Sequence, residues 1–200
     1  RAPRPGMVSV FTAASESFCQ RNINCSIDES FERFAPIMAA ARADGIPVRG
    51  YISCVTDCPY EGAIAPAAVA RVAGQLMEAG VEQVSLGETI GRGTPDAVDA
   101  MLGAVLNVAP AAMLAGHFHD TSGRALQNIE TALARGLRVF DSAAGGLGGC
   151  PYAPGAAGNV ATEAVAARLA ELGHDTGLDM GALARAAEFA RKLKGVAQDV

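Results

Sequence analysis

The chain has 200 residues, half of them hydrophobic, and a formal net charge of −5 at pH 7. No apolar run is long enough to cross a bilayer and no Lys/Arg cluster could follow a phosphate backbone, so membrane and nucleic acid are excluded as expected partners. The basic, Pro-rich start at 1–6 precedes an apolar stretch too short for a secretory signal, and we expect a soluble cytoplasmic protein. Five irregularly spaced cysteines favour free thiols in a reducing compartment.

Apolar β-rich runs alternate with Ala-rich amphipathic stretches along the chain, which predicts βα units around a parallel sheet. Five such units precede a last amphipathic helix. The predicted strands lie near 7–13, 47–53, 82–86, 111–117 and 138–142, and the predicted helices near 29–44, 65–79, 94–107, 122–135, 160–172 and 179–193. The predicted helix caps are Asp28, Thr94 and either Thr121 or Ser122.

Five βα units fall short of the eight in a (β/α)₈ barrel, which typically has about 250 residues. We therefore predict an α/β fold in which residues 1–200 form a single, partial TIM barrel without its first strands. The strands near 7–13 and 138–142 would then have unpaired edges. Such a chain is expected to aggregate, to form a homodimer or another homo-oligomer, or to belong to a longer or second polypeptide.

His117 and His119 end the fourth predicted strand, in the run Gly-His-Phe-His-Asp. Period-two alternation sends both imidazoles to one side, at the end of a barrel strand where such folds build their sites. The pair favours a transition-metal or Mg²⁺/Mn²⁺ centre completed by oxygen ligands, and by pattern alone a pair of core histidines is equally common. Asp120 follows as an acceptor for a ligating ring N–H or as a helix N-cap.

A glycine-rich segment at 145–155 follows the last predicted strand, and we expect it to be a mobile loop over the barrel mouth. It carries Cys150 between Gly and Pro. The thiol is therefore either a proton-transfer group near a metal or an incidental surface cysteine.

Further polar residues lie at the predicted ends of elements. Asn159 is either a helix N-cap or an amide ligand for a hard cation, and Glu163 either supports it or is a favourable first-turn acid. Glu88 ends the third predicted strand and either points a carboxylate into the same mouth or is a solvated loop acid. Cys54 and Cys58 lack the second pair that a zinc knuckle needs, so we interpret them as structural thiols.

Taken together, these segments resemble the 3-hydroxy-3-methylglutaryl-CoA lyase family over most of the chain, from Val10 to Lys194. The cysteine-containing glycine segment is the most specific part, because related metal-dependent aldolases and isopropylmalate or homocitrate synthases share the barrel and the two histidines but match it less. The matching runs are VFTAASE at 10–16, NINCS at 22–26, RGYISC at 49–54, CPYEG at 58–62, HFHDT at 117–121 and GLGGCPYAPGA at 146–156.

The resemblance implies a barrel enzyme that binds a divalent metal, Mg²⁺ or Mn²⁺, through His117, His119 and Asn159, with Cys150 taking part in proton transfer. The implied reaction is a retro-Claisen cleavage of 3-hydroxy-3-methylglutaryl-CoA into acetyl-CoA and acetoacetate, as in leucine catabolism and ketone-body formation. The implied partner is thus a small acyl-CoA substrate.

Other roles also come from the resemblance. It places Asn22 and Arg49 near the CoA portion of the substrate. It makes Glu88 a candidate catalytic acid, although the family usually has the shorter Asp there. Asp120 and Glu163 would support the metal ligands from a second layer.

The family's first strand carries an Arg-Asp pair that binds the metal and stabilises the enolate, and no segment of this chain matches it. We therefore expect the isolated chain to bind metal weakly and to have poor or absent activity. Two alternatives remain. A related metal aldolase on the same barrel would act on a 4-hydroxy-2-oxo acid, and a non-catalytic fragment would not bind Mn²⁺ through its histidines.

Overall fold

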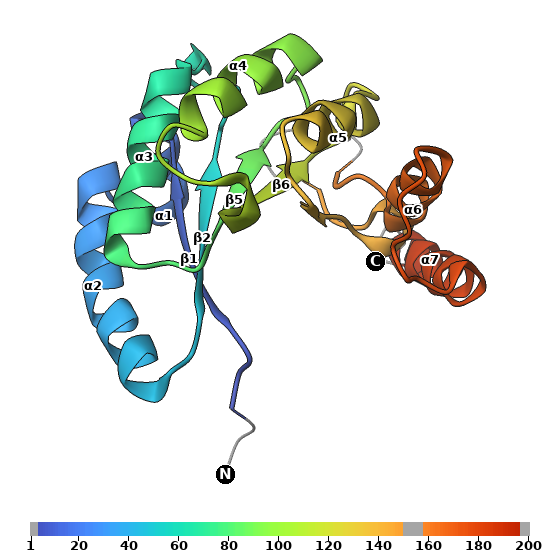
Figure 1. The fold of residues 1–200 in the computed structure, drawn as a ribbon, viewed down its shortest axis with the longest axis horizontal. Helices are drawn as coiled ribbons and strands as arrows, with labels where there is room; N and C mark the ends of the chain where they lie inside the picture. The colour runs from blue at the N-terminus through green and yellow to red at the C-terminus, as the bar shows by residue number, and fades with distance from the viewer. Residues whose placement is uncertain (1–3, 150–157, 197–200) are drawn as a thin grey trace.

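The fold is built on a five-stranded parallel sheet (Figure 1), seen in a computed structural model that describes residues 4–149 and 158–196. The strand order is β1-β2-β5-β6-β7, which follows the chain. All five predicted strands are confirmed, and the fourth begins later than predicted because a 3-10 turn precedes it. The strands are β1 Val8–Ala13, β2 Val48–Ser53, β5 Gln83–Glu88, β6 Leu114–Phe118 and β7 Val139–Asp141.

Helices cover the outer side of this curved sheet, with α2, α3, α4 and α5 in sequence along it (Figure 1). The arrangement is an arc of a parallel α/β barrel, which confirms the predicted fold class. A first short helix and a small hairpin, β3 Asp57–Cys58 with β4 Gly62–Ala63, were not predicted. The helices are α1 Glu16–Ile23, α2 Ile27–Asp44, α3 Pro66–Ala79, α4 Pro95–Val105, α5 Ala125–Ala134, α6 Thr162–Glu171 and α7 Met180–Val196.

The start of α2 differs from the prediction. Ser26 caps the helix, because its hydroxyl accepts from the Glu29 backbone N–H while the Glu29 carboxylate accepts from the Ser26 N–H. This reciprocal pair leaves Asp28 inside the first turn, so the cap predicted there is wrong. Thr94 caps α4 as predicted, by accepting from the backbone of Ala97 at 3.2 Å.

The sheet has two chemically different faces. Neighbouring residues in register point to the same side, and the register pairs Gly87 with His117 and Glu88 with Phe118. The outer face, under the helices, belongs to the apolar core and includes Val10, Ile52, Val84, Leu86, Leu114 and Phe118. The inner face carries polar side chains from β2, β5, β6 and β7, namely Arg49, Tyr51, Ser85, His117 and Asp141.

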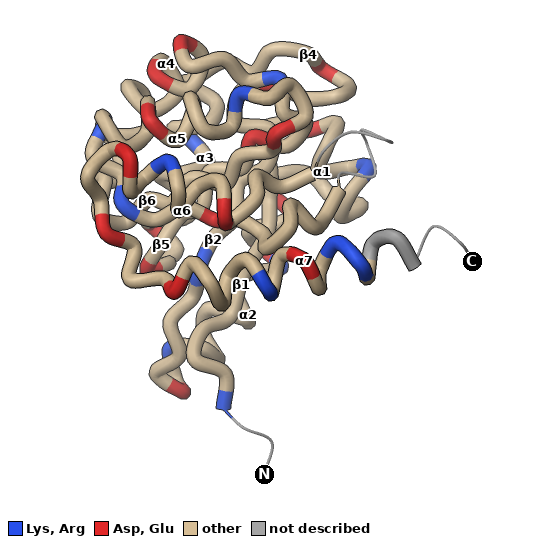
Figure 2. The backbone as a smooth tube through the Cα atoms, turned by 90° about the vertical axis from the view of Figure 1, so that its right-hand side faces the viewer, with Lys and Arg blue, Asp and Glu red and all other residues tan. Residues whose placement is uncertain are grey.

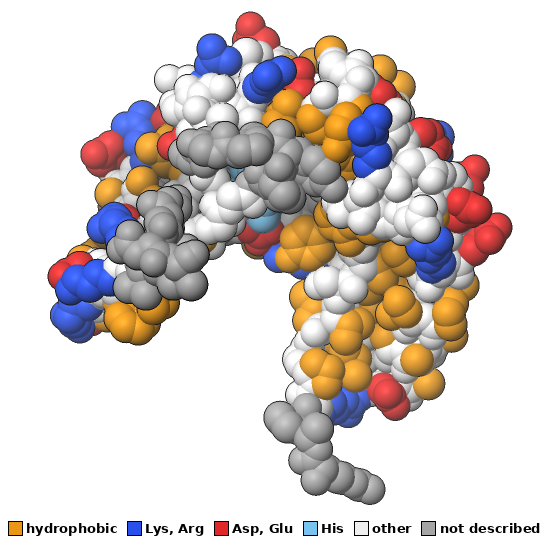
Figure 3. All heavy atoms as spheres, turned by 180° about the vertical axis from the view of Figure 1, so that it is seen from behind, with side chains coloured by type: hydrophobic (Ala, Val, Ile, Leu, Met, Phe, Trp, Pro, Cys, Tyr) orange, Lys and Arg blue, Asp and Glu red, His pale blue; other side chains and the backbone are white. Residues whose placement is uncertain are grey.

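The two ends of the sheet are open. Among the described strands β1 pairs only with β2 and β7 only with β6, so both are edge strands, as predicted. Seen from behind, the surface is hollowed between two lobes, with histidine and acidic atoms visible in the hollow (Figure 3). Charged residues of both signs are dispersed along the chain (Figure 2). Over residues 4–149 and 158–196, no helix has the length and apolarity to span a membrane.

Candidate active site

The two histidines lie at the carboxyl end of β6 on the inner face of the sheet. Their ring centroids are 5.6 Å apart. Both line one cavity of about 340 Å³, whose wall also includes Phe11, Tyr51 and Asn22. The His117 side chain is 30 % exposed, which rules out a pair buried in the core. The predicted convergence of His117 and His119 is therefore confirmed.

Asn159 lies against His119. A backbone bridge joins the two residues. The Asn159 amide nitrogen donates to the carbonyl oxygen of Leu147 at 3.1 Å, which leaves the amide oxygen as an acceptor. The alternative of a helix N-cap is wrong, because Ala161 occupies the N-cap position of α6.

The surroundings of His119 favour a neutral ring. Burial lowers the pKa of His119, and the nearby His117 lowers it further, against opposing hydrogen bonds from the Thr89 backbone and Asn159. Its Nδ1 is buried and has no hydrogen-bonding partner in the described part of the chain. A neutral imidazole keeps the lone pair that a metal ligand needs.

His117 has a partner that the sequence analysis missed. Asp141, on β7, sits beside it in register, and its Oδ2 lies 3.2 Å from His117 Nδ1. The same oxygen accepts from Ser85 Oγ at 2.9 Å, and Oδ1 accepts from Arg49 at 2.8 Å. Burial alone would raise the pKa of Asp141, but these hydrogen bonds and the Arg49 charge hold it below its usual value. The sequence feature that could have identified Asp141 is its position at the end of a predicted strand, two residues after Val139.

Asp120 does not support a histidine in this structure. Its Oδ1 accepts from the backbone of Ala125 at 3.0 Å, at the start of α5. It follows His119 by one residue, so alternation sends it away from the imidazoles. The cap-like alternative for Asp120 is favoured, and the caps predicted at Thr121 or Ser122 are wrong.

Glu163 also makes contacts different from those that the resemblance implies. Its Oε2 accepts from the backbone of Gly145 at 3.0 Å, and its Oε1 pairs with Arg191 of α7. These bonds tie the first turn of α6 to the segment after β7. We find no contact from Glu163 to Asn159 among the interactions of the described residues.

The structure corrects the predicted direction of Glu88. It lies one residue out of step with the inner face, so its side chain points to the outer side, away from His117. It is fully buried, and its Oε1 accepts from the backbone of Arg92 and Gly93 and from Thr56. Burial raises the pKa of Glu88, partly offset by these hydrogen bonds. The carboxyl group fixes the loop between β5 and α4; it is buried rather than solvated, and it does not line the histidine cavity.

The two candidate substrate contacts lie in different places. Asn22, on α1, lines the histidine cavity. Arg49 lies within the inner face, 13 % exposed, and its guanidinium bonds Asp141 and Tyr51. Cys150 lies outside the described residues.

The described start of the glycine segment reaches the cavity. Gly149 lines it, and a Cβ at Gly148 would lie 2.6 Å from Asn159 Nδ2. Gly148 also has a φ of 95°, which side chains rarely adopt. Glycine at 148 thus lets the backbone wrap closely around the Asn159 amide. Cys54 and Cys58 are buried, which is consistent with structural roles.

The residues present fit a divalent cation in part. Within the ranges that the structure covers, no three His, Cys, Asp or Glu side chains gather into a metal-binding group. Two imidazoles line one cavity, Asn159 is bridged to one of them, and burial lowers the pKa of that ring, His119, whose buried Nδ1 has no partner among the described residues. Such a set supplies part of a coordination sphere and leaves the remaining positions open.

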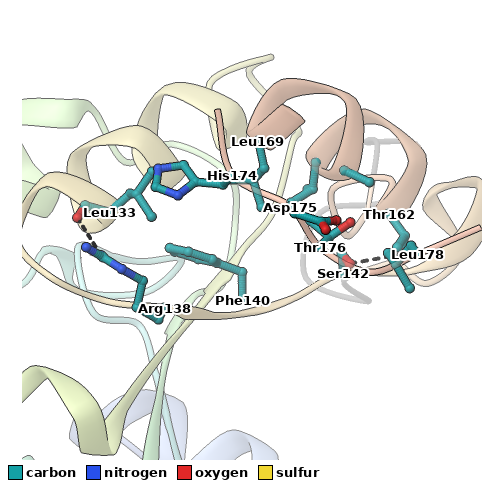
Figure 4. A pocket seen from close by; sticks show the side chains of 12 residues that line it. Leu133, Arg138, Phe140, Ser142, Thr162, Leu169, His174, Asp175, Thr176 and Leu178 are labelled. Carbon is teal, nitrogen blue, oxygen red and sulfur yellow. Dashed lines mark hydrogen bonds between the residues drawn. The ribbon is translucent and has the colours of Figure 1, made fainter. Parts of the chain in front are cut away.

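A second cavity, of about 390 Å³, lies on the other side of β7 (Figure 4). Its walls include Phe140, which alternates with Asp141, and the exposed His174. Figure 4 shows Arg138 at its wall, where the guanidinium donates to Leu133 O at 2.9 Å. The third histidine of the chain is therefore separate from the inner-face pair and provides a natural control for it.

A parallel sheet covered by helices, with two imidazoles at the carboxyl end of β6, is typical of α/β-barrel proteins that have their site at the barrel mouth. A comparison with protein families then gives the particular family. The chain belongs to the HMGL-like family, whose model matches residues 4–190.

Two of the similar curated proteins, one bacterial and one mammalian, are named hydroxymethylglutaryl-CoA lyase. The chain is 56 % identical to the hydroxymethylglutaryl-CoA lyase of Pseudomonas mevalonii over 178 residues, 89 % of this chain and 59 % of that protein. It is 56 % identical to the mitochondrial hydroxymethylglutaryl-CoA lyase of Bos taurus, over 91 % of this chain and 56 % of that protein. The chain thus spans somewhat more than half the length of these relatives.

Solved structures agree. The HMG-CoA lyase of Brucella melitensis superposes with a TM-score of 0.92 at 57 % identity, covering 94 % of this chain and 66 % of that one. Pyruvate carboxylase of Rhizobium etli superposes with a TM-score of 0.65 at 19 % identity, which shows the fold alone.

Proposed function

We propose that this chain forms part of a divalent-metal-dependent 3-hydroxy-3-methylglutaryl-CoA lyase, which cleaves a carbon–carbon bond in an acyl-CoA thioester. The observation that carries the proposal is that His117 and His119 line one cavity together with Gly149, while Asn159 is bridged to His119 through the backbone. The names of the relatives from Pseudomonas mevalonii and Bos taurus support the choice of substrate.

In this proposal His117, His119 and Asn159 hold Mg²⁺ or Mn²⁺ at the mouth of the barrel. A divalent cation held there would supply Lewis-acid chemistry that acidifies the tertiary hydroxyl of the substrate. The Asn159 amide is kept in place by its bond to Leu147 O, and the neutral His119 ring keeps a lone pair free. Asn22, at the cavity wall, is proposed to contact the CoA portion.

The chemical step is a retro-Claisen cleavage. The tertiary hydroxyl gives its proton to a base, its oxygen becomes the ketone carbonyl of acetoacetate, and the bond to the acetyl-CoA carbon breaks with its electron pair staying on that carbon, so that one proton is released and one is taken up. A proton must then reach this carbon, and we assign its delivery to the thiol of Cys150. Gly149 lines the cavity one residue before that cysteine, so the segment approaches the site. Excluding bulk water there would favour the intended proton donor.

The test is acetyl-CoA release from 3-hydroxy-3-methylglutaryl-CoA with added Mg²⁺ or Mn²⁺. Because the chain spans 59 % of the Pseudomonas mevalonii relative, it is assayed both as it stands and joined to the part of that relative that it does not match. We expect slow or absent release by the chain alone and metal-dependent release by the hybrid. His119→Ala should abolish release in the hybrid, whereas the matched control His174→Ala should keep it.

The opposite results are equally clear. A folded hybrid that binds Mn²⁺ but releases no acetyl-CoA contradicts the proposal, and cleavage of a 4-hydroxy-2-oxo acid instead would favour the related aldolase. A hybrid that binds no Mn²⁺ would favour a non-catalytic fragment.

We further propose that residues 1–200 act as a single domain that self-associates through its open sheet edges, β1 and β7. Sedimentation of the purified chain tests this, with a monomer as the contradicting result. The cytoplasmic location stays a proposal too, because relatives from Danio rerio and Rattus norvegicus are named cytoplasmic and others mitochondrial. Cell fractionation would decide it.

A further inference from the structure

The carboxylate of Asp141 is a hub on the inner face, connected to three other strands. It lies on β7 and receives Arg49 from β2, Ser85 from β5 and His117 from β6, at 2.8, 2.9 and 3.2 Å. We infer that Asp141, held by Arg49 and Ser85, is a positioning residue that fixes the His117 ring with Nδ1–H toward the carboxylate and Nε2 bare toward the cavity. The metal-binding consequence of this inference rests on the proposed function.

The tautomer follows from which atoms can donate. Oδ2 of Asp141 already accepts from the Ser85 hydroxyl, and an ionised carboxylate has no proton to give. The His117 nitrogen that faces this oxygen must therefore carry the hydrogen. In a neutral imidazole the other nitrogen then has the lone pair, as a metal-ligating histidine requires.

The Asp141 carboxylate is held in place by Arg49, which is itself held by Tyr51. The Arg49 guanidinium donates to Asp141 Oδ1 through one nitrogen and to the Tyr51 hydroxyl at 2.9 Å through another. It also lies 4.9 Å from the centre of the Tyr51 ring. With Arg49 13 % and Asp141 20 % exposed, the pair is largely shielded from water. The role inferred for Arg49 is to orient a ligand through Asp141, in place of the CoA contact implied by the family resemblance.

This geometry makes a sharp prediction for Asp141→Asn. Arg49 can only donate, so it selects the amide oxygen of the new side chain and turns the NH₂ group toward Ser85 and His117. An NH₂ facing Nδ1 needs a lone pair there, and the proton of His117 must then move to Nε2. An Asp-to-Asn change behind a catalytic histidine is known to impose the wrong tautomer in this way.

The experiment reads the imidazole nitrogens of the ¹⁵N-labelled chain by long-range ¹H–¹⁵N NMR at pH 8, with His117→Ala used to assign the signals. In the unchanged chain His117 should show Nδ1–H and a bare Nε2, and in Asp141→Asn the reverse. The matched control is Asp99→Asn, which alters another Asp–Arg pair, with Arg135 on the helix layer. It should leave the tautomer of His117 unchanged. The signals of His174 in the same spectra should not change in either variant.

Mn²⁺ titration of the same samples gives the second readout. Loss of the partner behind a ligating histidine typically weakens metal binding about 10–100-fold, and we expect this for Asp141→Asn and not for Asp99→Asn. If the tautomer reverses but no sample binds Mn²⁺, the positioning role stands and the proposed metal function fails. If His117 in the unchanged chain carries its proton on Nε2, or keeps Nδ1–H in a folded Asp141→Asn chain, the inference is overturned. The spectrum of the unchanged chain decides the matter even if the variant does not fold.

Discussion

The inner and outer faces of the same sheet differ in what their side chains do. On the outer face Ile52, Leu86 and Leu114 are fully buried under helices and supply apolar contact. On the inner face Asp141 and His117 form a hydrogen-bonded chain that ends at an open cavity. The two sets alternate along the same strands, so a shift of one residue would move a side chain from the apolar outer face to the polar inner face.

Glu88 shows how strictly this alternation acts. It stands one residue beyond Gly87, which pairs with His117, and that single step turns its carboxylate under the helices. There it holds the backbone of Arg92 and Gly93. An acidic residue at the end of a strand therefore does not by itself indicate a site. Its position in the alternation along the strand decides whether its side chain points to the inner or the outer face.

The largest effect expected is on the outer face, from Leu86→Ala. Leu86 is fully buried, and such truncations remove apolar contact and leave a cavity. We expect a loss of about 2–5 kcal/mol in the free energy of unfolding, measured by urea denaturation. Leu178→Ala is the control, since that side chain is 49 % exposed and should change stability little. Equal losses in both variants would contradict the assignment of the core to the outer face.

A smaller, pH-dependent effect is expected from Glu88→Gln. Burial raises the folded-state pKa of Glu88 above its ordinary value of 4.5. Its contribution to stability is therefore fully present below that value and is lost as the pH rises through the folded pKa. Relative to Glu88→Gln, the unchanged chain should become progressively less stable from about pH 4.5 upward, in denaturant melts across pH. A difference that does not vary with pH would mean that the carboxyl group is not desolvated.

The smallest effect concerns the helix layer, away from both faces. Thr94→Ala removes the hydroxyl that caps α4 and should cost about 1 kcal/mol in the free energy of unfolding. Thr94→Ser keeps that hydroxyl and should restore most of the loss. Neither variant should alter Mn²⁺ affinity, because α4 contributes no side chain to the inner-face hub. A change in Mn²⁺ affinity would contradict the separation of the helix layer from the inner face of the sheet.

Much of the fold could be predicted from the sequence, because the strands are short apolar runs and glycines close α2 and α3. The short α1 and the hairpin of β3 and β4 could not, since each is too brief to show a period. The convergence of His117 and His119 followed from their spacing on one strand. Asp141 was missed because its partners come from three other strands, which a one-dimensional pattern does not bring together.

The central proposal is that His117, His119 and Asn159 supply protein ligands to a divalent cation. Mn²⁺ titration of the chain, followed by electron paramagnetic resonance, tests it most directly. We predict saturable binding that His119→Ala weakens at least about tenfold and that His174→Ala leaves unchanged. Binding that is equal in both variants would place the cation elsewhere and contradict the account.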